Sequence, residues 1–293
     1  PRFALLLWFA LSLLSLPAIA ATFTVTNLND SGPGSLRQAM LEADAAVGDD
    51  TIVFQNGLSG TIILTTGQLT INSNIAIYGP GANVLAVSGN NVSPVFFVGI
   101  CIGPTASIDG LTIKDGNNIN SGGGIFNGGG TLTISNSILS GNSTRSEGGG
   151  IASVTTGCGS GNLFGKLTVI NSTLSGNSAF RLPGNAYGSP AGAISVGYMS
   201  TATISNSTLS GNSADSGGGG ILNFGTLAVS NSTISGNWST SQYGGGIFNS
   251  QGGTLTLSNS IVAGNIAPTG KEVFNVTWPG PGVGGGIFIS QGH

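Results

Sequence analysis

The sequence predicts an all-β fold: a right-handed, single-stranded parallel β-helix with an amphipathic helix capping its N-terminal end. A unit of about 26 residues recurs along the chain, and a recurring unit of this length is typical of a solenoid. Within each unit, apolar and polar residues alternate over short segments, with Gly and Asn at the junctions. Strands this short suit a coil in which every turn pairs with the next turn.

Residues 1–21 are predicted to be a secretory signal peptide. Arg2 precedes an apolar run from Phe3 to Leu16, and Ala18-Ile19-Ala20 supplies a small-residue cleavage pattern. We expect cleavage after Ala20 or Ala21. No later apolar run reaches the roughly 20 residues of a membrane-spanning helix, so we expect no transmembrane span in the mature chain.

Residues 22–60 form the predicted capping segment. Ser35 and Gln38 have the spacing of a capping box, which marks the start of a helix. Apolar residues then recur on one helical face, at Leu36, Ala39, Met40 and Ala43. We therefore expect a helix from Ser35 to about Ala46 that covers the open N-terminal end, where unpaired strand edges would otherwise bind another chain.

Residues 61–293 carry the β-helix repeats. The signature Gly-Gly-Gly-Ile, or the variant Ala-Gly-Ala-Ile, recurs at Ile125, Ile151, Ile194, Ile221, Ile247 and Ile287. In one unit this signature opens the first strand, Thr131 to Ser135 forms the second, and Ser137 to Ser140 forms the third. The inserts 152–166 and 179–191 should leave the coil as loops. Because the chain stops at His293, soon after another signature, we interpret it as truncated at its C-terminus.

A second signature, apolar-Ser-Asn-Ser, marks one corner of each unit. Its asparagine recurs at Asn136, Asn171, Asn206, Asn231 and Asn259. We expect the amides of this column to hydrogen bond from turn to turn as an asparagine ladder. A further asparagine closes each unit in a Gly-Asn pair, at Asn142, Asn177, Asn212, Asn237 and Asn265.

These motifs resemble those of a known family. The Gly-Gly-Gly-Ile-Phe-Asn and Leu-Thr-Ile-Ser-Asn-Ser units resemble the polymorphic outer membrane protein repeat, whose motifs are Gly-Gly-Ala-Ile and Phe-x-x-Asn; the phenylalanine is here mostly Ile, Val or Leu. The stretches Phe23 to Thr26, Asp30 to Arg37 and Asp50 to Phe54 resemble the entry segment of bacterial β-helix proteins of the CSLREA type. The resemblance implies a right-handed β-helix on an exported bacterial surface or secreted protein, and it implies no catalytic residues.

The composition argues against several classes of function. Only 6% of the residues are charged, so the chain cannot offer the basic patch that a nucleic-acid partner requires. The single histidine, His293, leaves no Ser-His-Asp triad and no multi-histidine metal site. We expect no metal and no cofactor.

A polysaccharide lyase or glycoside hydrolase of β-helix type is one alternative function. The best charged cluster spans neighbouring turns and consists of Lys114, Asp115, Arg145 and Glu147. Both acids precede a Gly-Gly-Gly-Ile signature and should share a corner. Hydrolysis needs two carboxyl groups about 5–9.5 Å apart, whereas mixed charges also form solvated ion pairs. Whether the chain is an enzyme stays open, with a non-catalytic function favoured.

Outward-facing side chains suggest a second alternative. Thr133, Thr168, Thr203 and Thr256 form one column, which Ala228 interrupts. Such a face resembles those of ice-binding β-helices and indicates an ice- or lattice-binding protein, although threonine is also a common solvent-side strand residue. A further outward stripe should follow the isoleucines, at Phe126, Ala152, Ser195, Leu222, Phe248 and Phe288.

The favoured function is an exported structural or adhesin-like module that presents a polar Thr/Ser/Asn face and loops. A carbohydrate or a host or cell-surface protein is the expected partner, and the expected location is secreted or at the cell surface, associated with the outer membrane. After export Cys101 and Cys158 could pair, but the sequence does not decide between a disulfide and two thiols.

Overall fold

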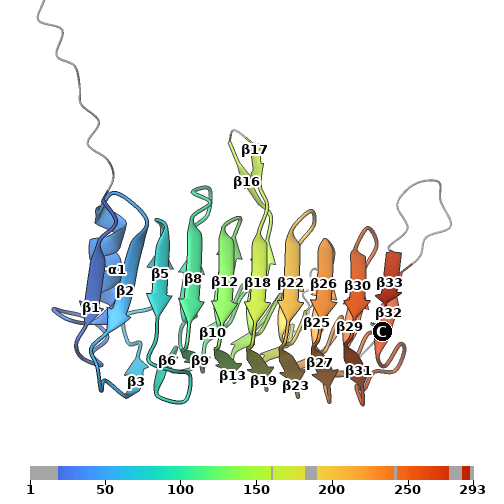
Figure 1. Cartoon of the computed structure of the whole chain (residues 1–293). Helices are drawn as coiled ribbons and strands as arrows, with labels where there is room; N and C mark the ends of the chain where they lie inside the picture. Colours follow the sequence, from blue (N-terminus) through green and yellow to red (C-terminus); the bar gives the residue numbers. More distant parts are fainter. Residues whose placement is uncertain (1–18, 160, 182–189, 241–242, 277–285, 291–293) are drawn as a thin grey trace, which may run out of the picture.

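The computed structural model describes residues 19–159, 161–181, 190–240, 243–276 and 286–290. These residues form a parallel β-solenoid of about nine turns, which confirms the predicted fold class (Figure 1). Most of the predicted signal peptide, residues 1–18, lies outside the described residues. Within the described part of the chain, no helix is both long and apolar enough to cross a membrane.

Successive turns stack their strands into parallel sheets. Sheet A consists of β1 (Thr22–Val25), β2 (Asp50–Phe54), β5 (Ile75–Tyr78), β8 (Thr105–Asp109), β12 (Thr131–Ser135), β18 (Lys166–Ile170), β22 (Thr201–Ser205), β26 (Thr226–Ser230), β30 (Thr254–Ser258) and β33 (Gly286–Ser290). Sheet B consists of β3 (Gly60–Ile63), β6 (Leu85–Ser88), β9 (Thr112–Lys114), β13 (Ile138–Ser140), β19 (Thr173–Ser175), β23 (Thr208–Ser210), β27 (Thr233–Ser235) and β31 (Ile261–Ala263).

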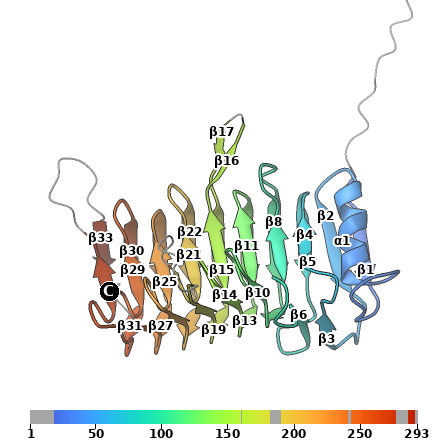
Figure 2. The same cartoon turned by 180° about the vertical axis from the view of Figure 1, so that it is seen from behind.

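Sheet C closes the coil, and its strands are labelled in Figure 2, where the molecule is turned by 180° from Figure 1. It consists of β4 (Leu69–Ile71), β7 (Phe96–Val98), β11 (Ile125–Gly128), β15 (Ile151–Val154), β21 (Ile194–Val196), β25 (Ile221–Asn223), β29 (Ile247–Asn249) and β32 (Val273–Asn275). A fourth sheet, D, consists of the short strands β10 (Asn117–Asn118), β14 (Ser143–Thr144), β20 (Ser178–Ala179), β24 (Ser213–Ala214) and β28 (Trp238–Ser239). The prediction of three strands per unit missed sheet D, because a two-residue strand is too short to show alternation.

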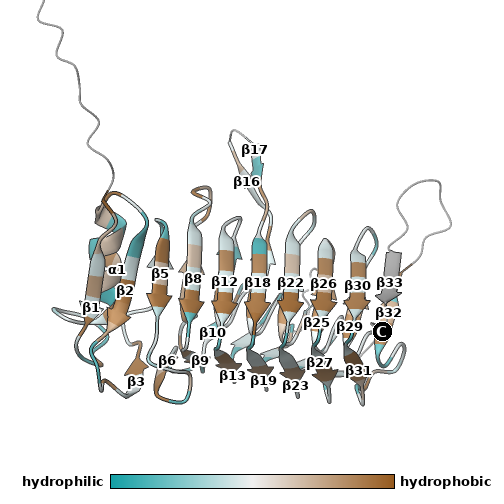
Figure 3. Cartoon of the chain, in the orientation of Figure 1, coloured by the Kyte–Doolittle hydropathy of each residue, from teal (hydrophilic) through white to brown (hydrophobic). Residues whose placement is uncertain are grey.

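The core consists of columns of apolar residues at the inward-facing positions of successive turns. Leu132, Leu167, Ala202 and Leu227 pair in register in sheet A and are almost fully buried, as are the neighbouring Ile134 and Val169. Brown bands recur at similar levels on successive strands of sheet A in Figure 3. Because residues alternate between the two faces of a strand, the residues between these core positions face outward.

The prediction that Ile287 lies in the same column as the other signature isoleucines was wrong. Val273 takes the position of an isoleucine in sheet C, paired with Ile247, whereas Ile287 pairs with Leu255 in sheet A. Val-Phe-Asn replaces Ile-Phe-Asn with similar chemistry but without the three glycines that mark the signature.

A helix, α1 (Leu36–Ala45), lies against β1, β2 and β4 at the N-terminal end of the solenoid (Figure 1). The Ser35 hydroxyl accepts a hydrogen bond from the Gln38 N–H at 3.1 Å, and Leu36, Ala39, Met40 and Ala43 are buried. The Gln38 side chain donates to Glu42 instead of reaching back to Ser35. That α1 blocks association at this end stays a prediction.

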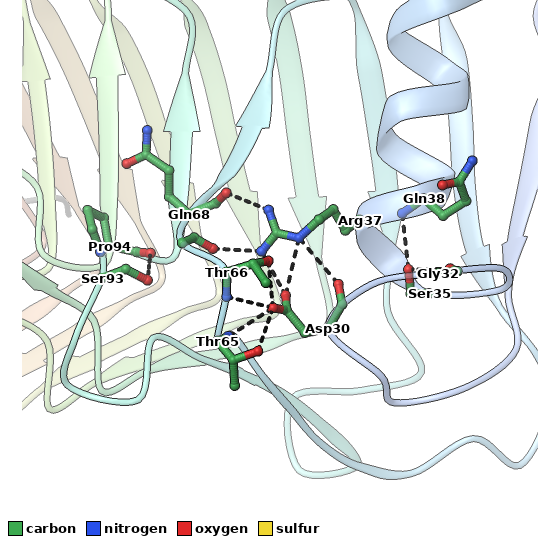
Figure 4. A network of polar contacts seen from close by, with 11 residues as sticks. Asp30, Gly32, Ser35, Arg37, Gln38, Thr65, Thr66, Gln68, Ser93 and Pro94 are labelled. Carbon is green, nitrogen blue, oxygen red and sulfur yellow. Dashed lines mark hydrogen bonds and ion pairs between the residues drawn. The ribbon is translucent and has the colours of Figure 1, made fainter.

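Asp30 joins the capping segment to the residues that follow β3 in the solenoid (Figure 4). Its carboxylate pairs with the Arg37 guanidinium at 2.7 Å and accepts hydrogen bonds from the N–H and hydroxyl groups of Thr65 and Thr66. Arg37 also donates to the carbonyl oxygens of Gly67 and Gln68. Burial alone would raise the pKa of Asp30, but the hydrogen bonds from Arg37, Thr66 and Thr65 outweigh it and hold that pKa well below its usual range.

Candidate binding surface

The turns between sheets C and A lie along one edge of the solenoid, here called the loop edge. Its described residues are 72–74, 99–104, 129–130, 155–159, 161–165, 197–200, 224–225 and 250–253. Large apolar side chains are exposed there, at Ile100, Ile102, Tyr198 and Met199. Exposed apolar side chains that gather on one edge are typical of a contact surface.

A hairpin projects from the loop edge beyond the neighbouring turns (Figure 1). Its strands, β16 (Thr156–Cys158) and β17 (Gly161–Leu163), pair antiparallel, and they form part of the predicted insert 152–166. A disulfide joins Cys158 to Cys101, which lies two turns earlier between β7 and β8, and the two Cα atoms are 5.4 Å apart. The sequence left this pairing open, because the two cysteines are 57 residues apart and only the coiling of the chain brings them together.

The base of the hairpin is bound to the turns on both sides. The Thr156 hydroxyl donates to the Gly128 carbonyl at 3.1 Å, and the Thr155 hydroxyl donates to the Tyr198 carbonyl. Leu163 packs so closely on Gly129 that a Cβ at this glycine would lie 2.6 Å from the Leu163 Cβ. The hairpin is therefore held in a defined position on the loop edge.

An open pocket of about 540 Å³ lies further along the same edge. Its lining combines aromatic, amide and hydroxyl groups, from Tyr198, Met199, Phe224, Gly225, Thr226, Gln251 and Gly252. Tyr198 is 66% exposed, so its ring is available to a partner. Ligand sites bring aromatic side chains together with a small number of polar groups, and this pocket contains both kinds of group.

We expect removal of the disulfide to loosen the hairpin more than the solenoid. In the double variant Cys101→Ser/Cys158→Ser, limited proteolysis should cut first within residues 155–165, and the free energy of unfolding should fall by at most about 4 kcal/mol. Adding a reductant to the unaltered chain should give the same cleavage pattern and the same loss of stability, and it should change neither in the double variant. An unaltered cleavage pattern would show that the hairpin does not need its covalent anchor.

The asparagines of the predicted ladder lie at exposed corners of the solenoid. Asn136, Asn171, Asn206, Asn231 and Asn259 are exposed and have φ between 45° and 50°. They recur because a left-handed corner favours Asn or Gly, and one 3.4 Å hydrogen bond joins the amides of Asn171 and Asn136. The left-handed corner is therefore sufficient to explain why these asparagines recur, and a ladder along the whole column stays a prediction.

The continuous ladder is formed by the buried asparagines that close each unit. Each side-chain NH₂ donates to the Oδ1 atom on the next turn, at 2.9, 3.0, 2.8 and 2.9 Å, along Asn142, Asn177, Asn212, Asn237 and Asn265. At the last turn, Asn265 donates to the Glu272 carboxylate at 2.7 Å. Serines form a second column beside this ladder. The backbone N–H of Ser137 donates to the Ser172 hydroxyl, and the same bond links Ser172 to Ser207, Ser207 to Ser232 and Ser232 to Ser260. The recurrence of both residue types was visible in the sequence, but their burial was not.

The outward threonines of sheet A form the predicted column. Thr133, Thr168 and Thr203 pair in register on three successive turns, and Ala228 then separates Thr203 from Thr256. Neighbouring strands of a sheet lie about 4.8 Å apart, so these hydroxyl groups repeat at that interval. Lys166 interrupts the adjacent column between Thr131 and Thr201, so the regular area is small.

The predicted charged cluster is divided between two corners. Lys114 and Asp115 are partly exposed and 3.6 Å apart at the end of β9, where Asp115 also accepts a hydrogen bond from Ser88. Arg145 and Glu147 lie beyond β14, on the other side of sheet D, and Arg145 lines a separate pocket. The assumption that the two acids share a corner was wrong, since Asp115 precedes the short strand β10 and Glu147 follows β14.

Glu147 is the acid with the most unusual environment in this cluster. Burial raises its pKa, and a 3.4 Å hydrogen bond from the Ser195 hydroxyl partly opposes this effect. Other acids of the repeats bind structural donors: Asp109 binds Ser135 and Asn136, and Glu272 binds Asn265. Among the described residues, no group of three His, Cys, Asp or Glu side chains could hold a metal ion.

The stripe after the isoleucines faces outward but is not exposed. Ala152, Ser195 and Leu222 are fully buried and Phe248 is 8% exposed; the side chain of Phe288 lies outside the described residues. Leu222 and Phe248 pack with Ala191, Phe224, Tyr243 and Phe274 in a second apolar cluster. The part of this face from Ala152 onward is therefore covered, whereas Phe126 is half-buried and stacks on Phe97.

Comparison of the chain with family models, curated proteins and solved structures finds no match. The resemblance to the polymorphic outer membrane protein repeat and to the CSLREA-type segment therefore depends on the quoted motifs alone. The fold and the loop edge are the observations from which a function can be inferred.

Proposed function

We propose that this chain is an exported structural module whose loop edge binds a neutral carbohydrate on a cell surface or matrix. The observation that carries this proposal is the exposed Tyr198 ring beside the amide of Gln251 and the hydroxyl of Thr226, held on a rigid solenoid. An aromatic ring offers apolar contact area at a small cost in conformational entropy, while amide and hydroxyl groups can bind sugar hydroxyls. With 17 charged side chains among 293 residues, the surface suits an uncharged partner better than a charged one.

Two further features support export. The apolar run from Phe3 to Leu16, followed by Ala18-Ile19-Ala20, has the pattern of a signal peptide. A disulfide between Cys101 and Cys158 persists best in an oxidising compartment outside the cytosol. On this proposal, the protein acts at the cell surface or in the medium, and the resemblance to bacterial β-helix proteins agrees with this location.

The test is a sedimentation assay with insoluble polysaccharides such as cellulose, chitin and peptidoglycan. We expect cellulose or chitin, which are uncharged, to bind the unaltered protein in preference to peptidoglycan, which is charged, and Tyr198→Ala to weaken that binding at least about tenfold, as for an aromatic anchor. Thr203→Ala, on the outer face of sheet A, is the matched control and should bind normally. Loss of binding in both variants, or no binding by the unaltered protein, would contradict the proposal. Release of reducing ends would favour the glycosidase alternative instead.

A further inference from the structure

The first turn of the solenoid contains a buried carboxylate that is only half satisfied. Asp50 begins β2 and is 1% exposed. Its Oδ1 atom accepts a hydrogen bond from the backbone N–H of Ala21 at 2.7 Å. Its Oδ2 atom is buried and has no hydrogen-bond partner among the described residues. A buried carboxylate oxygen without a partner is costly, so this arrangement calls for an explanation.

Ala21 is held at this site by the backbone. Its carbonyl oxygen accepts the Thr51 N–H at 2.8 Å, and the Asp50 N–H donates to the Asn74 carbonyl at 3.0 Å. These bonds fix the nitrogen of Ala21 beside the Asp50 side chain, independently of the residues that precede it. The neighbouring acid, Asp49, accepts a hydrogen bond from the Asn74 side chain.

The peptide bond before Ala21 is also the bond that a signal peptidase would cut. Ala18 and Ala20 occupy the two small-residue positions of the Ala-x-Ala pattern, which places the cut between Ala20 and Ala21. Hydrolysis breaks the bond between the Ala20 carbonyl carbon and the Ala21 nitrogen. Water supplies the oxygen of the new Ala20 carboxylate, and the Ala21 nitrogen becomes an amine. Because an α-amine has a pKa of about 8, it takes up a proton and is a cation at neutral pH.

We propose that removal of the leader creates an α-ammonium group at Ala21 that pairs with both carboxylate oxygens of Asp50 and locks the first turn. The amide of the uncut chain has one N–H, which Oδ1 accepts. The ammonium group has three, so a second is available to the buried Oδ2 atom. Asp50 is thus a receptor for the new terminus, and the processed chain is more stable than its precursor. The proposal rests on the proposed function in one respect: export supplies the signal peptidase that cuts the chain before Ala21.

The experiment compares three forms of the protein at pH 7: the full chain, the chain that begins with a free amine at Ala21, and the same chain acetylated at Ala21. We expect the free-amine form to melt about 5 °C or more above the other two, since a buried ion pair is present only there. Asp50→Asn should remove this difference. Similar melting temperatures for the free and acetylated forms, or a difference that survives Asp50→Asn, would overturn the proposal.

A second measurement does not depend on the stability of any variant. The α-amine of the Ala21 chain should react with an acylating reagent at least about tenfold more slowly than the α-amine of the Asp50→Asn chain, because the ion pair protects it. Equal rates would contradict the ion pair. Polysaccharide binding on the same samples separates the two proposals, because failure of the ion pair leaves binding at the loop edge unchanged. The mass of the protein secreted by an exporting host should correspond to a chain that starts at Ala21, and another start would contradict the assigned cut.

Discussion

Asn212→Ala should destabilise the solenoid by about 3 kcal/mol or more, because several buried polar groups lose their partners at once. The Asn212 side chain donates to the carbonyl of Leu174 and to Oδ1 of Asn237, and it accepts from the backbone and side-chain nitrogens of Asn177. Alanine offers none of these four contacts. Thermal unfolding should show a melting temperature lower by roughly 6–12 °C.

Asn206→Gly is the matched control in the same turn. Asn206 is exposed and has a φ of 50°, a conformation that glycine adopts without strain. Its free energy of unfolding should change by less than about 1 kcal/mol. Equal losses of stability in the two variants would show that the buried column has no special role.

Asp30→Ala should have a similarly large effect at the N-terminal end. The substitution leaves the Arg37 guanidinium without its carboxylate and removes the acceptor for the donors of Thr65 and Thr66. Because the pair is partly buried and several donors lose their acceptor, we expect a loss of about 3 kcal/mol. Since Arg37→Ala breaks the same network, the double variant should lose less than the sum of the two single losses, which denaturant unfolding can measure.

The pH dependence gives an independent check on Asp30. Its pKa is lowered in the folded state, so its contribution to stability is complete above the unfolded pKa of about 4 and is lost as the pH falls below that value. The unaltered protein should therefore lose more stability between about pH 5 and pH 2 than the Asp30→Ala variant. Parallel curves for the two proteins would contradict the assigned network.

The sequence predicted the core and the strand register well because both follow from local alternation. Leu132 and Ile134 face inward because they alternate with Thr131, Thr133 and Ser135, and the repeat aligns them with the next turn. Periodicity does not reveal why a polar residue recurs, however. Asn136 and Asn142 repeat with the same period, but one satisfies a left-handed corner and the other a buried ladder.

From the sequence, only the boundaries of the inserts between repeats could be predicted, and not the structure of the loop edge. The pairing of Cys101 with Cys158 and the pocket beside Tyr198 arise from residues on different turns, so neither has a local sequence pattern. The covering of Leu222 and Phe248 was missed for the same reason, since Tyr243 follows Leu222 by one turn and Phe274 follows Phe248 by one turn. Asp30 and Arg37 stood in a recognised motif, but their partners in residues 65–68 did not.

The buried asparagine ladder sets the unit in which this protein can change its length during evolution. Consecutive ladder partners are 35, 35, 25 and 28 residues apart, yet their amide hydrogen bonds differ by only 0.2 Å. Extra residues are therefore accommodated outside the ladder, whereas a one-residue deletion between β23 and β24 would shift Asn212 out of the column. Loss of residues 212–236 would place Asn237 next to Gly211 in the chain and opposite Asn177 in the ladder, with the same donors and acceptors. A whole turn could therefore be added or removed with the column intact, whereas a small deletion within a turn would break it.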